Sequence, residues 1–301
     1  MASNLNFDYP EYEREWQKVL SDPNKQQVGE TWFRPDTLDA WRHQRMRAPL
    51  RAVIEADPNA SWLTIGDGRF GTDANFLLTA GAKSVHCTDI SDTLLKIGHA
   101  KGFIKSFSAE NAERLTFGDN SFDYIYCKES LHHFARPYAA LYEMFRVAKK
   151  GVILTEPRDT SLDKELMTLL KDFIKTLLRK KIVASHGFEP IGNYIYGVSE
   201  RELEKFLLGM HFTEIAYIGC NDAYAEGVEF VPIDSTVVEH VALKKKIFSE
   251  IQQLDFLCSL GVRKSTLLTA ALFKESPSIE LKATMTKLGW SVSQLPINPY
   301  R

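Results

Sequence analysis

Three glycines at a fixed spacing are the first residues in this sequence that point to chemistry. Gly66, Gly68 and Gly71 form the pattern G-x-G-x-x-G. Because glycine has no Cβ, such a turn lets the main chain bend sharply and lets a ligand lie directly against it. Asp89 follows 18 residues after Gly71, at a separation where a carboxylate can accept hydrogen bonds from both hydroxyls of a ribose. The two features predict a site for an adenosine-containing ligand, against the alternative of a tight turn and an unrelated surface aspartate.

A second group of residues could move a proton. Residues 127–134, Cys-Lys-Glu-Ser-Leu-His-His-Phe, bring two histidines and a carboxylate together. Imidazole suits a general base at neutral pH, so His132 and His133 are candidate catalytic residues, and Glu129 could orient an imidazole or bind a substrate hydroxyl. His186, in a loop that contains several glycines, is a further candidate base. The alternatives are histidines that pack against the sheet, a solvated carboxylate and a surface loop.

The elements around these residues alternate between strand and helix. Strands are expected at residues 61–65, 84–89, 122–127 and 151–155, and helices at 72–80, 91–103 and 137–147, from the period of their apolar residues. This alternation predicts a parallel sheet with helices on both faces. In such sheets the ligand lies at the carboxyl ends of the strands, where the glycine turn, Asp89 and the two histidines would meet.

Short stretches of residues 60–157 resemble, in the same order, the class I S-adenosylmethionine-dependent methyltransferases, and in particular those of type 11. They are Trp62-Leu63-Thr64-Ile65-Gly66-Asp67-Gly68, Thr88-Asp89-Ile90-Ser91, Ala112-Glu113-Arg114-Leu115-Thr116-Phe117, Asn120-Ser121-Phe122-Asp123, Leu131-His132-His133-Phe134 and Arg146-Val147-Ala148-Lys149-Lys150-Gly151. The resemblance implies a Rossmann-like, doubly wound α/β fold with a mostly parallel seven-stranded sheet, helical N-terminal and lid insertions, and S-adenosylmethionine as cofactor. It also implies that the three glycines lie under the methionine and ribose, that Asp89 holds the ribose, and that Asn111 and Ala112 face the adenine.

Two positions depart from the family pattern. Members usually carry an acid two residues before the first glycine, where this chain has Thr64, while Asp67 lies inside the turn. We expect Asp67 to contact the ammonium group of the cofactor; the alternative is a cap on the following helix. Asn111 stands where many members have Asp, and its amide can accept from the adenine amino group and donate to a ring nitrogen. Ile90 and Lys128 complete the predicted cofactor site.

The chain beyond residue 157 is less regular. A long amphipathic helix is expected over residues 162–180, a helix over 199–209, and a third over 236–257 between strands at 211–218 and 266–274. We expect these strands to close the same sheet. The predicted organisation is an N-terminal helical cover (residues 1–57), a cofactor-binding core (58–157), acceptor-binding and lid insertions with closing strands (158–274), and a C-terminal tail (275–301).

The composition excludes several classes of protein. The chain has 301 residues, 44% of them apolar, and 37 Lys and Arg against 39 Asp and Glu give a formal charge of −2. This apolar content can form a substantial core, and the balanced charge lacks the basic excess of a protein that coats nucleic acid or an anionic membrane. The four cysteines are scattered, and no signal peptide or membrane span is recognisable. We therefore expect a cytoplasmic enzyme that binds a small-molecule acceptor, not nucleic acid or a membrane. No metal-binding residues are predicted, and metal dependence and the oligomeric state are left open.

Three hypotheses of function follow from these residues. The first is methyl transfer from S-adenosylmethionine to a small polar acceptor, such as a hydroxyl of a sugar or of another biosynthetic intermediate. The second is an NAD(P)-dependent oxidoreductase that uses the glycine turn. Tyr124 and Lys128 have the Y-x-x-x-K spacing of some such enzymes, but Tyr124 lies in an expected strand, where this spacing does not join the two side chains as it would on a helix. The third is a non-catalytic scaffold that retains the cofactor-binding fold.

Overall fold

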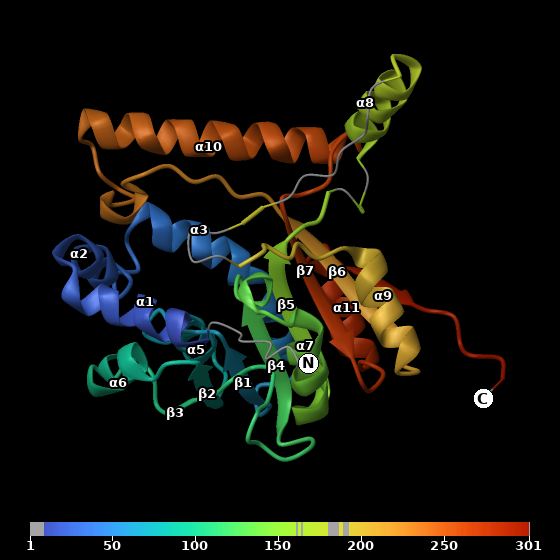
Figure 1. Ribbon diagram of the computed structural model, residues 1–301, viewed down its shortest axis with the longest axis horizontal. Helices are drawn as coiled ribbons and strands as arrows, with labels where there is room; N and C mark the ends of the chain where they lie inside the picture. The colour runs from blue at the N-terminus through green and yellow to red at the C-terminus, as the bar shows by residue number, and fades with distance from the viewer. Residues whose placement is uncertain (1–8, 161, 164, 180–186, 189–192, 301) are drawn as a thin grey trace, which may run out of the picture.

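The computed structural model describes residues 9–160, 162–163, 165–179, 187–188 and 193–300. One sheet crosses the described part of the chain, in the strand order β3-β2-β1-β4-β5-β7-β6-β8 (Figure 1). The strands are β1 (Ser61–Ile65), β2 (Ser84–Asp89), β3 (Phe107–Ala109), β4 (Phe122–Lys128), β5 (Ala148–Pro157), β6 (Glu214–Cys220), β7 (Leu267–Phe273) and β8 (Ser291–Gln294). Strands β1 to β5 pair in parallel, and β7 runs antiparallel to both β5 and β6. The predicted doubly wound, mostly parallel α/β fold is confirmed.

The described sheet has eight strands rather than the predicted seven. The additional strand is β8, in the segment 275–301 for which the sequence indicated no structure; it pairs antiparallel with β6. Without it, β6 would present an open edge to solvent. β3 also escaped the sequence pattern, because three residues are too few to show a period.

Helices cover both faces of the sheet (Figure 1). They are α1 (Tyr9–Ser21), α2 (Pro23–Thr31), α3 (Leu38–Arg47), α4 (Arg51–Ala56), α5 (Thr72–Thr79), α6 (Thr93–Ala100), α7 (Pro137–Val147), α8 (Leu166–Leu177), α9 (Glu200–Gly209), α10 (Val238–Ser259) and α11 (Ile279–Lys287), with short 3-10 turns at Ala48–Leu50, Leu131–His133 and Val228–Phe230. Side chains of α7 and α9 pack on one face, and those of α4, α5, α6 and α11 pack on the other. Alternate residues along each central strand enter the two cores, as the pleat requires.

Helices α3 and α10 form a smaller core beside the sheet. Leu38 of α3 packs with Ile247 and Ile251 of α10, and the ring centroids of Trp41 and Phe248 are 4.6 Å apart. α10 thus lies across α3 (Figure 1). Within the described residues, no helix combines the length and apolar character needed to cross a membrane.

Candidate cofactor and active site

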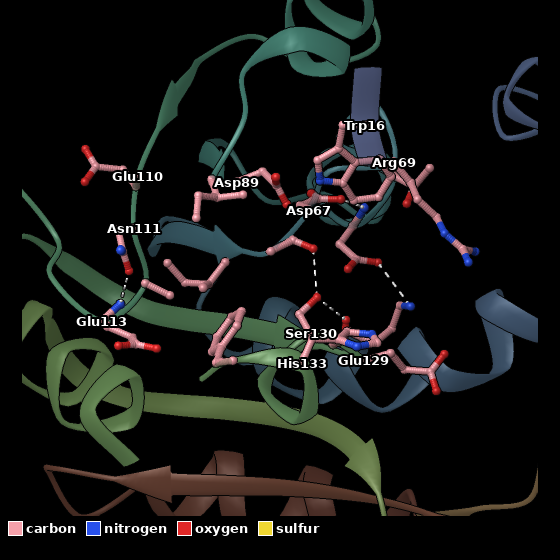
Figure 2. A pocket seen from close by; sticks show the side chains of 18 of the residues that line it. Trp16, Asp67, Arg69, Asp89, Glu110, Asn111, Glu113, Glu129, Ser130 and His133 are labelled. Atoms are coloured by element: carbon pink, nitrogen blue, oxygen red, sulfur yellow. Dashed lines mark hydrogen bonds and ion pairs between the residues drawn. The ribbon is translucent and has the colours of Figure 1, made fainter. Parts of the chain in front are cut away.

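A cavity of about 400 Å³ opens at the carboxyl ends of β1, β2 and β4 (Figure 2). Its size falls within the range of small-molecule sites, and its position is where an open α/β sheet binds ligands. The cavity lining includes most of the residues predicted from the sequence, namely Gly66, Asp67, Asp89, Ile90, Asn111, Ala112, Lys128, Glu129 and His133. The topology therefore brings together residues that lie as much as 67 positions apart in the chain.

The glycine turn has no room for side chains. Gly66 has φ +70°, and a Cβ there would lie 2.5 Å from the Cβ of Ser130. The Ser130 hydroxyl donates to the Gly66 carbonyl at 2.8 Å, which ties the turn to the segment after β4. A Cβ on Gly68 would lie 2.7 Å from Oδ2 of Asp89, and Gly71 has φ +81°. The glycines thus allow neighbouring segments of the same chain, and a ligand, to lie directly against the backbone of the turn.

Asp67 caps the following helix. Its carboxylate accepts from the backbone N–H of Asp73 at 3.0 Å and of Ala74 at 2.8 Å, and from the Thr64 hydroxyl at 3.0 Å. This is the alternative role set out from the sequence. Asp67 also lines the cavity, and its contact with a cofactor ammonium group stays a prediction. Burial, together with the charge of Asp73, raises the pKa of Asp67 to about 7.

Asp89 is a buried carboxylate at the end of β2. It accepts from the backbone N–H of Ser91 at 3.1 Å, and hydrogen bonds from Trp16, Gly68 and Ile90 also reach it. Burial outweighs these contacts and raises the pKa of Asp89 to about 7. A ligand that brought further hydroxyl donors would stabilise the carboxylate, which is what a ribose does.

Trp16 of α1 is a cavity residue that the sequence did not single out. Its indole ring lies over Gly68, where an added Cβ would be 2.4 Å from a ring carbon. Figure 2 shows the ring beside Asp89 and Asp67. Together with Val19 and Lys25 it forms the N-terminal side of the cavity, so the segment predicted as a helical cover does reach the site.

The loop after β3 lines the opposite end of the cavity. The Asn111 side-chain oxygen accepts from the backbone N–H of Glu113 at 2.9 Å, which leaves the amide nitrogen as the group of this side chain available to donate (Figure 2). The Glu110 carboxylate is held by the backbone N–H and hydroxyl of Thr116, and Glu113 pairs with Arg136. Asn111 and Ala112 line this end of the cavity, and one of the two amide functions of Asn111 is used within the loop. Their contact with an adenine stays a prediction.

Cationic side chains gather at the end of the cavity near β4 and α5. Lys128 Nζ lies 3.9 Å from a carboxylate oxygen of Asp73 and 3.2 Å from Nδ1 of His43. Arg47 bonds to the same aspartate at 2.5 Å, and Arg69 Nη1 lies 3.1 Å from Nε2 of His43. Of these five, all except Arg47 line the cavity. Three cations against one carboxylate leave a positive excess suited to an anionic group.

His43 is neutral in this environment. Burial lowers its pKa well below the usual value, and the charges of Lys128 and Arg69 lower it further. Asp73 shows the opposite balance: burial raises its pKa, but the charges of Lys128 and Arg47 outweigh burial and hold the pKa below its usual value. No sequence pattern marked His43 or Asp73 as site residues, although both lie in segments that were predicted to be helical.

The two adjacent histidines have different surroundings. His132 Nδ1 lies 2.6 Å from the carboxylate of Glu156, a fully buried residue of β5. The backbone N–H groups of Ser130 and Leu131 donate to the other oxygen of Glu156 at 3.0 and 2.9 Å. Burial raises the pKa of Glu156, but the charge of His132 and these hydrogen bonds outweigh burial and lower it overall. Glu156 was not identified from the sequence; its place at the carboxyl end of a central strand is the signal that could have found it.

His133 lines the cavity, and its ring centroid is 3.9 Å from that of His132. Glu129 also lines the cavity and has φ +47°, a conformation that non-glycine residues rarely adopt and that clusters at functional sites. In Figure 2 its carboxylate extends away from the glycine turn. His186 lies outside the described residues. Among the candidate bases that the structure describes, His133 is thus the one directed to the cavity.

Comparisons with known proteins agree with this geometry. Residues 63–155 match the methyltransferase domain family. The ubiquinone/menaquinone biosynthesis C-methyltransferases UbiE of Burkholderia cenocepacia (strain HI2424) and Burkholderia mallei (strain SAVP1) are each 31% identical over 121 residues, which is 38% of this chain and 50% of theirs. The chain therefore spans about half the length of the curated relatives it matches.

Solved structures of methyltransferases are also similar to this chain. Magnesium protoporphyrin IX methyltransferase (ChlM) from Synechocystis PCC 6803, with bound SAH, is 18% identical, with 77% of this chain and 84% of the other covered and a TM-score of 0.44. The family match over residues 63–155 supports S-adenosylmethionine rather than a nicotinamide as the ligand. The predicted resemblance is confirmed for this segment: residues 63–155 of the chain form a methyltransferase domain of the class I S-adenosylmethionine-dependent kind.

Proposed function

We propose that this protein transfers the methyl group of S-adenosylmethionine to a hydroxyl of a small polar acceptor, such as a sugar or another biosynthetic intermediate. The observation that carries the proposal is one continuous cavity with Asn111 toward one end, the cationic group toward the other, and Asp89 and His133 in the wall between them (Figure 2). A cofactor and an acceptor can meet there without leaving the cavity.

The residues present fit the cofactor in three parts. Asn111 would donate to the adenine, and Asp89, whose pKa is raised by burial, would accept from the ribose hydroxyls. Arg69 and Lys128 would hold the carboxylate of the methionine part, because both line the cavity where positive charge is in excess. The backbone of the glycine turn would lie against the middle of the molecule.

The chemistry needs alignment and one proton acceptor. S-adenosylmethionine supplies a methyl group that is already activated on a sulfonium; as the acceptor oxygen forms its bond to the methyl carbon, the carbon–sulfur bond breaks and its electron pair stays on sulfur. The cavity walls hold the acceptor in line, which can contribute roughly 7–11 kcal/mol. His133 would take the hydroxyl proton as the new bond forms.

His132 and Glu156 would fix the position of the His133 ring on the side away from the cavity. The short contact between His132 Nδ1 and Glu156 fixes the orientation of the first imidazole, and the His132 ring packs directly on the His133 ring. This arrangement supports a positioning role for His132 and a catalytic role for His133. Glu129, at the same edge of the cavity, would bind a hydroxyl of the acceptor.

The names of these relatives indicate a second class of acceptor. The UbiE proteins are named as C-methyltransferases of ubiquinone and menaquinone biosynthesis, so carbon of an activated ring is the alternative to oxygen. Proton removal by His133 would serve either acceptor, since an enol or phenol must also lose a proton. An acceptor panel should therefore include sugars and phenolic compounds.

Titration calorimetry with S-adenosylhomocysteine is the first test. We expect the wild type to bind and Asp89→Ala to lose binding by about a hundred-fold or more, because two hydrogen bonds to a charged group are lost. Binding of NADH in place of S-adenosylhomocysteine would refute the proposal in favour of an oxidoreductase.

Methyl transfer from labelled S-adenosylmethionine is the second test. His133→Asn should lower kcat by roughly 10²–10⁴-fold while its affinity for S-adenosylhomocysteine stays within about three-fold of the wild type. His211→Asn is the matched control, because His211 is exposed after α9 and its φ of +64° is one that Asn tolerates. Full activity of His133→Asn would refute its role as base, and cofactor binding without transfer to any acceptor would favour a scaffold.

A further inference from the structure

Helix α8 presents its apolar side to solvent. Figure 1 shows it apart from the sheet, near the C-terminal end of α10. Its exposed large apolar side chains are Leu166, Leu169, Leu170, Phe173, Ile174 and Leu177. They recur at the three- and four-residue spacing that places side chains on one face of a helix. None of them belongs to a hydrophobic core among the described residues.

The polar side of α8 is the side that is partly covered. Thr168, Asp172 and Lys175, which are spaced to share the opposite face, are each less exposed than the apolar residues. A surface helix of a globular protein normally has the reverse arrangement, with its apolar stripe toward the core. Phe173 is 67% exposed and Leu170 58% exposed. A contiguous apolar face of this kind marks a site of interaction.

The charges beside this face are positive. Lys171 is exposed and borders the apolar stripe, and Arg179 is exposed just after the helix. Lys180 and Lys181 follow in the sequence. The acid of the helix, Asp172, lies on the partly covered side. A second copy of the chain, docked through the same face by a two-fold axis, would bring equal positive charges together, whereas an anionic lipid surface would attract them.

We infer that α8 is an interfacial helix that docks the protein on an anionic lipid surface, with Leu170 and Phe173 among the side chains that enter the bilayer. A helix with an apolar face and lysines beside it lies in the plane of such a surface and buries its apolar side chains below the headgroups. α8 follows β5 in the chain, and β5 pairs with β4, whose last residue, Lys128, lines the cavity. The sequence predicted no membrane partner, because the charge of the whole chain is balanced and no membrane span is recognisable.

Vesicle flotation of the full chain tests this inference. The vesicles contain either phosphatidylcholine alone or two parts phosphatidylcholine to one part phosphatidylglycerol. We expect flotation with the anionic vesicles and little with the neutral ones, and we expect added salt to weaken it by screening. The double substitution Leu170→Ser and Phe173→Ser should reduce vesicle binding by about ten-fold or more, since the burial of each large apolar side chain in the bilayer contributes to the free energy of binding. Lys171→Gln should reduce it by about five-fold.

Ile279→Ser is the matched control, because Ile279 is 89% exposed and belongs to α11. It should float as the wild type does. The Leu170/Phe173 variant should keep its thermal midpoint and its affinity for S-adenosylhomocysteine, so a failure of docking is distinguishable from a failure of the proposed activity. Flotation of that variant at the wild-type level would overturn the inference. So would a wild-type protein that floats with neither the neutral nor the anionic vesicles. A dimer in sedimentation experiments that the same variant abolishes would identify a second copy as the partner and would also overturn it.

Discussion

Asp89→Asn should stabilise the unliganded protein at neutral pH while removing its cofactor binding. The carboxylate of Asp89 is buried, and its pKa is raised from 3.8 to about 7. A group whose pKa is raised on folding contributes stability at low pH that is lost as the pH rises through the folded pKa. The free energy of unfolding of the wild type should therefore fall between about pH 4 and pH 7 through this residue, whereas the neutral amide of Asn is insensitive to pH.

The size of the effect follows from the shift. Each pH unit within the window corresponds to 1.36 kcal/mol, so the advantage of Asp89→Asn over the wild type should grow by about 2 kcal/mol between about pH 5.5 and pH 7. Urea denaturation of both proteins at the two pH values measures this difference. The pKa of Asp67 is raised in the same way. Its contribution to the free energy of unfolding is present in both proteins and therefore cancels in the difference between them.

Asp92→Asn is the control for this experiment. Asp92 lies at the start of α6 and makes an exposed ion pair with Lys96 at 2.8 Å, so its replacement should change stability by under about 1 kcal/mol at either pH. Calorimetry should show that Asp89→Asn no longer binds S-adenosylhomocysteine and that wild-type affinity weakens as the pH falls below about 7, because the ribose hydroxyls need the ionised carboxylate. An advantage of Asp89→Asn that is equal at both pH values would refute the reasoning.

Three further predictions follow from single contacts. Trp16→Phe should remove most of the change in tryptophan fluorescence on addition of S-adenosylhomocysteine, since the indole of Trp16 lies against Gly68 at the cavity; an undiminished change would show that another tryptophan reports binding. Glu156→Gln should lower kcat about ten-fold and alter its pH profile with little effect on KM, because the contact that orients His132 weakens; an unchanged pH profile with a lower thermal midpoint would indicate a structural role alone. Gly66→Ala should lower the free energy of unfolding by about 1–3 kcal/mol in urea titrations, through its left-handed φ and the collision with Ser130; wild-type stability would show that the turn has more freedom than its geometry indicates.

The charged side chains around the candidate cofactor site come from segments that are far apart in the sequence. The sequence identified Lys128 as a cofactor residue, but its neighbours His43 and Asp73 come from α3 and α5. No local pattern marks His43 as a buried neutral imidazole between two cations. Its state is set by desolvation and by charges that only the packing of α3 against the sheet brings near.

The position of Asp67 in the sequence allowed two roles. The sequence places an acid inside the glycine turn, where a cofactor contact and a helix cap are equally compatible with its position. The fold directs the carboxylate to the N-terminus of α5, whose first N–H groups have no partner within the helix. Similarly, two adjacent histidines are alike in sequence, but Glu156 of β5 holds one and the cavity receives the other.

The sequence by itself determined the order of strands and helices in the core, the glycine turn and the place of Asp89 at the end of a strand, because these depend on residue period and on backbone freedom at fixed spacings. Its resemblance to a known family indicated the class of domain. Only the tertiary structure decided that the C-terminal segment adds a strand beside β6, that Trp16 lies over Gly68, and that α8 turns its apolar face outward. These features arise from contacts between segments far apart in the chain, whose free energy depends on what each surface meets in space rather than on its local pattern.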